Sequence, residues 1–128
     1  MSAMSDFLEL EVLDHVLGTG SYTMPTTVRI GLSTGSFGDD NSGTELSGSG
    51  YARQAITFAA ASSGSAATNA TVTFPTATGS WGSVGFWGIF DAASGGNLLI
   101  HGAFATPKTI TSGDVLRINS GDLTVTAA

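Results

Sequence analysis

Residues 83–105 read SVGFWGIFDAASGGNLLIHGAFA and contain the densest apolar stretch of the chain. Ser83–Asp91 is apolar at both odd and even positions, which is typical of a strand that is covered on both faces. Ser94–Asn97 has the composition of a hairpin turn, and Leu98–Ala105 continues as an apolar segment. The stretch therefore predicts a central β-hairpin, in which Gly85 and Gly88 let a neighbouring backbone or ring approach closely.

On both sides of this hairpin, short segments alternate between apolar and polar residues, as half-buried strands do. Turns rich in Gly, Ser and Thr separate them, and Pro107 marks an expected break. Because no helices alternate with the strands, we predict an all-β fold, an antiparallel β-sandwich or jelly-roll-like barrel of about seven or eight strands. The expected outer strands are 28–32, 52–58, 72–74, 115–119 and 123–126.

One short helix is predicted at the N-terminus, over about residues 5–17. Apolar residues recur there at steps of three or four, Ser5 suits the N-cap position, and Gly18 suits the position after the helix. No linker or repeat divides the chain. We therefore expect a single domain over residues 1–128, with the helix followed by the β-sandwich at 22–128.

Composition excludes several classes of protein. The chain has 128 residues, four basic and ten acidic side chains, and a formal net charge of −6, so binding to a nucleic-acid backbone is not expected. The absence of cysteine removes disulfides, thiolate catalysis and cysteine-ligated zinc. No apolar run approaches the length of a membrane span. A surface so poor in charge suits a protein that is covered by copies of itself or by a partner.

Two patterns raise the possibility of catalysis. Gly31–Gly35 matches Gly-x-Ser-x-Gly, the turn that presents a nucleophilic serine, but residues 36–40 do not suit the helix that this motif requires. His101 and Asp91 fall on the predicted hairpin, where they resemble a base and its orienting carboxylate. A hydrolase acting through Ser33 and His101 is the weaker hypothesis, because a strand histidine with an ordinary hydrogen bond explains the same residue. We expect no enzyme and no cofactor.

The long loop Ser33–Gly50 carries Asp39, Asp40, Asn41 and Glu45, whose oxygens suit calcium, although their spacing is not that of an EF-hand. A solvated acidic loop is the favoured interpretation, so no metal is expected. The rare cations Arg29 and Arg53 are expected to pair with carboxylates across strands or between subunits.

The helix, the loop and several aromatic residues are the expected contact surfaces. Trp81, in the turn 79–82, is the best candidate for an exposed aromatic residue, although packing under the loop is favoured. The candidate interface residues are Phe7, His15, Tyr22, Phe37, Asp39, Asp40, Tyr51, Arg53 and Trp81.

Four runs, LDHVLG at 13–18, GYARQ at 50–54, VTFP at 72–75 and GIFDAASGGNL at 88–98, resemble a family of small virion proteins of tailed bacteriophages. The resemblance extends from Asp6 to Thr126 and departs from the family pattern at Phe86-Trp87, where a more polar residue usually precedes the aromatic. Family members are often labelled tail fibre proteins, and proteins of this size and style also serve as head decoration or cement proteins. The resemblance supplies no catalytic residues.

The resemblance implies a non-enzymatic structural protein of the virion, made in the host cytoplasm. Tail fibres usually gain length from coiled coils or repeats, and this chain has neither. We therefore expect first a capsid decoration or cement protein, a homotrimer that bridges neighbouring copies of the major capsid protein. The alternative is a tail fibre, tail tip or baseplate component that binds receptors, including glycans through Trp81 or Tyr51.

Overall fold

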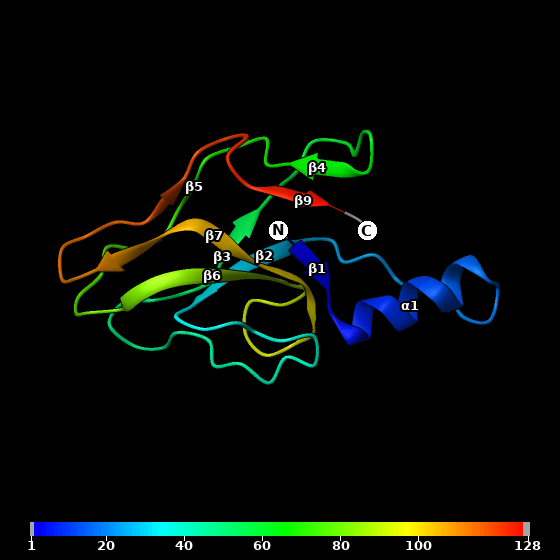
Figure 1. The fold of residues 1–128 in the computed structure, drawn as a ribbon, viewed down its shortest axis with the longest axis horizontal. Helices are drawn as coiled ribbons and strands as arrows, with labels where there is room; N and C mark the ends of the chain where they lie inside the picture. The colour runs from blue at the N-terminus through cyan, green and yellow to red at the C-terminus, as the bar shows by residue number, and fades with distance from the viewer. Residues whose placement is uncertain (1, 127–128) are drawn as a thin grey trace.

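Nine strands and one helix form the part of the chain described by the computed structural model, residues 2–126 (Figure 1). In chain order they are β1 (Ser2–Met4), α1 (Asp6–Val16), β2 (Val28–Ser33), β3 (Gln54–Ile56), β4 (Ser65–Ala67), β5 (Val72–Thr73), β6 (Gly82–Phe90), β7 (Leu98–Ile110), β8 (Arg117–Ile118) and β9 (Thr124–Thr126). Every strand pairing is antiparallel, which confirms the predicted all-β, sandwich-like class with one N-terminal helix.

The main sheet has the strand order β1-β7-β6-β2-β3, and the two smaller sheets are the pairs β4-β9 and β5-β8. The predicted hairpin is present as β6 and β7, and β6 lies at the centre of the main sheet. The largest core cluster lies between the main sheet and the segments that carry the two smaller sheets. It contains Ile30, Leu32, Val84, Trp87 and Ile89 from the main sheet and, from the segments across from it, Val72, Phe74, Leu116, Ile118 and Leu123.

β7 continues through Pro107 as far as Ile110, so the break expected at this proline is wrong. The strand accommodates the proline through a shift in register: Val84 pairs with Lys108, whereas Phe86 pairs with Ala103. Phe104–Pro107 therefore bulge out opposite Gly85 alone, and a bulge tolerates proline because the ladder there needs no backbone N–H. A Cβ atom at Gly85 would lie 3.4 Å from the Pro107 ring.

The strand count exceeds the expected seven or eight because β1 and β4 lie in segments that the sequence did not indicate as strands. The register of β1 pairs Ala3 with His101, which places β1 on the outer edge of β7. Residues 2–4 carry no alternating pattern, so only the edge of β7 makes them extended.

Gly31 of β2 lies directly opposite Gly88 of β6 on the second face of the main sheet. A Cβ atom at Gly31 would lie 2.7 Å from a Glu45 carboxylate oxygen, and one at Gly88 would lie 2.9 Å from Leu98. The two glycines leave a trough into which side chains from the long loop and the β6–β7 hairpin fit. Phe37, Phe90 and Leu98 form a second, smaller buried cluster on this face.

Helix α1 begins and ends as the sequence predicted. The Ser5 side chain accepts a hydrogen bond from the backbone N–H of Leu8, and Asp6 and Glu9 lie in the first turn, where the helix dipole favours anions. Gly18 follows the helix with a φ of 79°, the left-handed conformation that glycine adopts most readily. Figure 1 shows α1 projecting from one end of the β layers. Residues 2–126 contain no helix with the length and apolarity needed to span a bilayer.

Candidate interaction site

The base of α1 is fastened to the body of the protein by its first residues. The backbone N–H of Ser5 donates to the carbonyl of Leu99 at 2.8 Å, and its buried hydroxyl donates to the carbonyl of Leu98. The backbone N–H of Asp6 donates to the carbonyl of Asp39 at 2.8 Å. Ser5 therefore caps the helix and joins it to β7 with the same side chain, and this sets the direction in which α1 projects.

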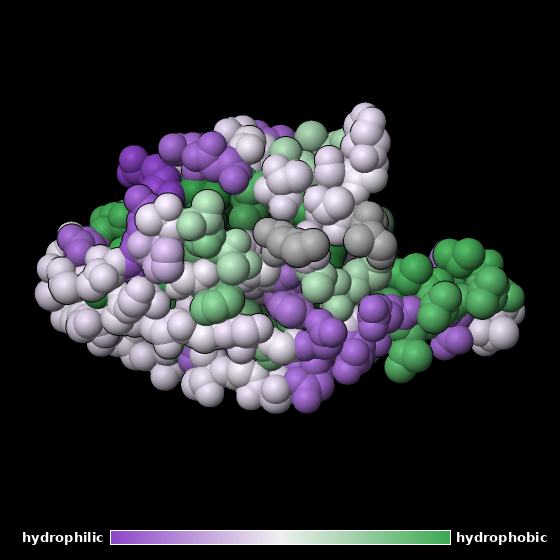
Figure 2. Space-filling model, in the orientation of Figure 1, coloured by the Kyte–Doolittle hydropathy of each residue, from purple (hydrophilic) through white to green (hydrophobic). Residues whose placement is uncertain are grey.

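Beyond this base, α1 has no buried residue. Leucine and valine side chains cover its outward surface, which we call the arm face; their exposed fractions are 63% for Leu10, 54% for Leu13, 72% for Val16 and 70% for Leu17. Figure 2 shows these apolar residues gathered on the projecting part of the molecule. An apolar face that residues 2–126 leave uncovered is a candidate interaction surface. Carboxylates lie within or beside this face at Asp6, Glu9 and Asp14, whereas Glu11 lies on the other side of the helix, toward Tyr22.

The segment after the helix folds back against α1. The backbone N–H of Tyr22 donates to Nδ1 of the exposed His15 at 3.3 Å, and the Tyr22 side chain is half-buried. Partial burial, and then the nearby carboxylates of Asp91 and Glu11, raise the pKa of the Tyr22 hydroxyl. Phe7 is also half-buried. Among the candidate interface residues on this arm, His15 is thus the most open to a partner.

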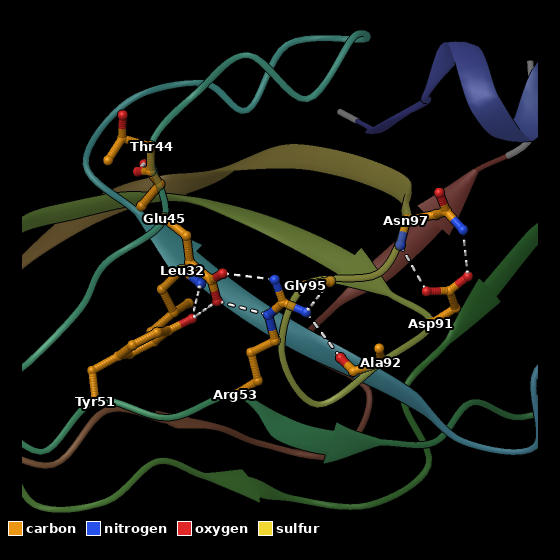
Figure 3. A network of polar contacts seen from close by, with 10 residues as sticks. Leu32, Thr44, Glu45, Tyr51, Arg53, Asp91, Ala92, Gly95 and Asn97 are labelled. Carbon is orange, nitrogen blue, oxygen red and sulfur yellow. Dashed lines mark hydrogen bonds and ion pairs between the residues drawn. The ribbon is translucent and has the colours of Figure 1, made fainter.

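The long loop is held by Arg53, whose guanidinium forms a two-pronged ion pair with Glu45 at 2.7 and 2.8 Å (Figure 3). The remaining guanidinium nitrogen donates to the carbonyls of Ala92 and Gly95, each at 2.9 Å. Only 7% of the Arg53 side chain is exposed. Arg53 therefore joins the loop to the β6–β7 turn, and its hydrogen-bonding capacity is used within the chain.

Tyr51 completes this network, which we call the loop lock and define as Glu45, Tyr51 and Arg53. The Tyr51 hydroxyl donates to the Glu45 carboxylate and accepts from the backbone N–H of Leu32 at 2.9 Å. Burial, reinforced by the hydrogen bond to Glu45, raises the pKa of Tyr51 far above its ordinary value. The hydroxyl is therefore a fixed donor and does not act as a base.

The aromatic candidates are engaged inside the protein. Phe37 and Trp81 are buried, which corrects the expectation that they contribute to an exposed contact surface. The indole N–H of Trp81 donates to the carbonyl of Ser49 at 2.9 Å, so packing under the loop is its role. Tyr51 stacks on Phe74 and meets Trp81 edge-on. The ring faces suggested for a glycan are therefore in contact with other side chains.

The acidic loop residues separate into different contacts. Asp39 accepts a hydrogen bond from, or forms an ion pair with, Nε2 of His101 at 2.7 Å. Hydrogen bonds from the hydroxyl and backbone N–H of Ser42 lower the pKa of the exposed Asp40. Glu45 belongs to the loop lock. Within residues 2–126 no group of three His, Asp or Glu side chains lies close enough together to hold a metal ion.

The three groups of the hydrolase hypothesis have separate partners in the structure. The buried Ser33 hydroxyl donates to the carbonyl of Thr44 at 2.6 Å and accepts from the backbone N–H of Gly35, and no helix follows it. His101 pairs with Asp39, whereas Asp91 accepts from the backbone and side chain of Asn97 and so fixes the hairpin turn. The three groups therefore serve separate structural contacts.

The helix is one of the contact surfaces that the sequence predicts, but the leucines of the arm face are not among the predicted contact residues. The spacing of Leu10, Leu13 and Leu17 predicts a helix and does not indicate that these side chains face solvent. One available indication is that apolar residues occur all around α1, which leaves one apolar side uncovered when the helix packs on only one side.

Comparison with known protein families gives one match that spans nearly the whole chain. The family described as "Podophage GP4 fiber I protein gp80" matches residues 3–126. Among curated proteins, no match is found. The matched segment includes α1, β2 to β9 and all of β1 except Ser2.

Proposed function

The chain belongs to the podophage GP4 fiber I protein gp80 family, a family of phage virion structural proteins, and from this premise we propose that it is a non-enzymatic structural subunit of a tail fibre. The family description supports the fibre assignment. The observation in the structure that carries the proposal is the arm face, a projecting apolar helix surface that residues 2–126 leave uncovered. Such a surface is suited to permanent contact with a neighbouring subunit.

We propose that this contact includes copies of the same chain, with a homotrimer as the expected assembly. Repeated weak contacts around a ring give a stable assembly through avidity. The loop lock contributes rigidity, because it fixes the long loop against the β6–β7 turn and so keeps the body from deforming under load. No nucleic-acid or membrane partner is part of this proposal.

A second candidate function is decoration or cementing of the capsid, in contact with the major capsid protein. The observation that favours it is that residues 2–126 form no elongated element. Within this range α1 is the only helix and has 11 residues, and no repeated unit extends the fold. Fibres that reach far from the particle usually use coiled coils or repeats. A short fibre built from compact subunits satisfies both observations, and we therefore rank the fibre role first.

Localisation on intact virions tests the proposal. Electron cryo-microscopy of particles that carry an epitope insertion at the exposed turn Ser62–Ser63 should show extra density on tail-associated fibres. Density spread over the capsid surface would support the decoration role and refute the fibre role. Loss of infectivity with loss of fibres in a deletion mutant, restored by the wild-type chain, is the matching genetic result.

The non-enzymatic part of the proposal is tested separately. Ser33→Ala and His101→Ala virions should retain any ability of the particle to degrade host surface polymers. A loss confined to these two variants, with the protein still present on the particle, would contradict a purely structural role.

A further inference from the structure

We infer that the arm face of one copy docks into a cationic groove on the body of a second copy, head to tail. This deepens the proposed function, because it rests on the chain acting by self-association and names the two surfaces involved. The groove is a hollow of about 160 Å³. Its apolar lining includes Val84, Leu116 and Leu123, and Lys108, Arg117 and Asp122 carry its charges.

Charge complementarity selects this groove. The chain has four basic side chains. Arg53 is locked to Glu45, and two of the other three, Lys108 and Arg117, line the groove and are exposed. With one carboxylate, Asp122, the groove keeps a net positive charge. The arm face carries three carboxylates within or beside its leucines, Asp6, Glu9 and Asp14, so the two surfaces match in both apolar character and charge.

The same charges argue against the simplest alternative, a bundle of α1 helices. Leu10, Leu13 and Leu17 have the spacing of a coiled-coil seam. In a parallel bundle with that seam, Glu9 of one helix would face Asp14 of the next, and these like charges repel. An 11-residue helix also offers only a short seam.

The fold places the two surfaces far apart. Figure 1 shows α1 projecting at one end of the molecule, whereas β5, which pairs with β8 beside the groove, lies toward the other end. The arm therefore meets the groove of another copy and not its own. A contact between two different surfaces closes into a ring or continues as a filament, depending on the rotation between subunits. Both outcomes suit a fibre subunit.

A hollow of this size accepts an aliphatic or benzene-sized apolar group, so it is large enough for one leucine of the arm face. We place Leu13 there, because it lies in the middle of the exposed helical surface. Glu9 and Asp14 then lie on either side, within reach of Lys108 and Arg117.

Directed cross-linking tests the contact. Because the chain contains no native cysteine, only the introduced cysteines can form disulfides. Full-length Leu13→Cys and Thr106→Cys chains are mixed under mild oxidation; Thr106 lines the groove and is exposed. The expected product is the mixed disulfide dimer, formed at least tenfold faster than with the control Ser62→Cys, which is exposed on the other layer. Predominant Leu13→Cys homodimers would show a helix bundle and overturn the inference, as would equal rates with the control.

Charge reversal provides a second readout by sedimentation velocity. Lys108→Glu with Arg117→Glu, or Glu9→Lys with Asp14→Lys, should each weaken self-association at least tenfold, and mixing the two variants should restore it. The wild-type association should weaken as salt rises. A wild-type chain that stays monomeric, or groove variants that associate normally, would refute the inference. Absence of the protein from tail fibres would instead refute the proposed function and leave the cross-link unaffected.

Discussion

The guanidinium carbon of Arg53 lies 3.7 Å from the centroid of the Phe90 ring. This cation–π contact completes an environment in which Glu45, two backbone carbonyls and an aromatic face surround one nearly buried cation. Phe90 in turn meets Phe37 edge-on. The loop lock is therefore continuous with the smaller core cluster, and Arg53 is one of several contacts that hold the long loop, together with those of Thr44 and Ser49.

Replacing Arg53 should be among the most destabilising single changes in the molecule. Arg53→Ala leaves the Glu45 carboxylate, 23% exposed, without its cation and removes the contact with Phe90, so a loss of about 3 kcal/mol is expected. Arg53→Lys should recover part of this, because lysine keeps the charge but not the two-pronged geometry. Urea unfolding of the purified chain measures both, with the exposed Arg117→Ala as a control that should change stability by less than about 0.5 kcal/mol.

Alanine substitutions at Gly31 and Gly35 distinguish a steric clash in the folded protein from the general effect of replacing a glycine. Gly31→Ala places a methyl group 2.7 Å from Glu45 and 3.0 Å from Phe90, and we expect it to cost about 1–3 kcal/mol through displacement of the loop lock. Gly35→Ala meets no atom within 4 Å and should be neutral or slightly stabilising. Equal unfolding midpoints for the two variants would contradict the close packing described for Gly31.

Alkaline pH should destabilise the protein through Tyr51. The folded-state pKa of this hydroxyl is raised by burial and by the Glu45 hydrogen bond, so the folded protein holds the proton more tightly than the unfolded chain. Its contribution is complete below the unfolded pKa of about 10 and is lost as the pH rises above that value. Thermal melts in this range should show a falling midpoint, and Tyr51→Phe should be less sensitive to pH. The same slope in both proteins would exclude Tyr51 as its source.

The direction of the arm should depend on Ser5. Ser5→Ala removes the cap hydrogen bond to Leu8 and the contact with Leu98, and a loss of about 1–2 kcal/mol is expected. Since α1 has no buried residue, the effect should appear mainly as a lower helical circular dichroism signal and faster amide exchange in α1. Ser21→Ala, at an exposed position after the helix, is the matched control. An unchanged helical signal in Ser5→Ala would contradict this anchoring role.

Local elements followed from the sequence with good accuracy. An apolar stretch without alternation and the SGGN turn predicted the β6–β7 hairpin, and the Ser5 cap with Gly18 predicted α1, because both kinds of pattern act between residues close in the chain. The sequence did not predict β1, β4 or the continuation of β7 through Pro107, since each depends on a strand or bulge whose partner is remote in sequence.

For the contact residues too, the sequence predicts the kind of contact but not the partner. The sequence indicated that Arg53 pairs with a carboxylate, yet Glu45 was first considered as a calcium ligand, and only the folded loop brings the two together. Likewise, the repeat of leucines in α1 predicts a helix but does not show which side is covered.

The spacing of residues along the chain was enough to predict the all-β class, the central hairpin and the capped N-terminal helix, because this spacing sets which side chains share a face of a strand or helix. Only the folded structure shows that the helix leaves its leucines exposed, that Arg53 pairs with Glu45 of the long loop, and that Lys108 and Arg117 line the same hollow. These outcomes depend on how distant segments pack, and packing assigns each face a neighbour that no local period specifies.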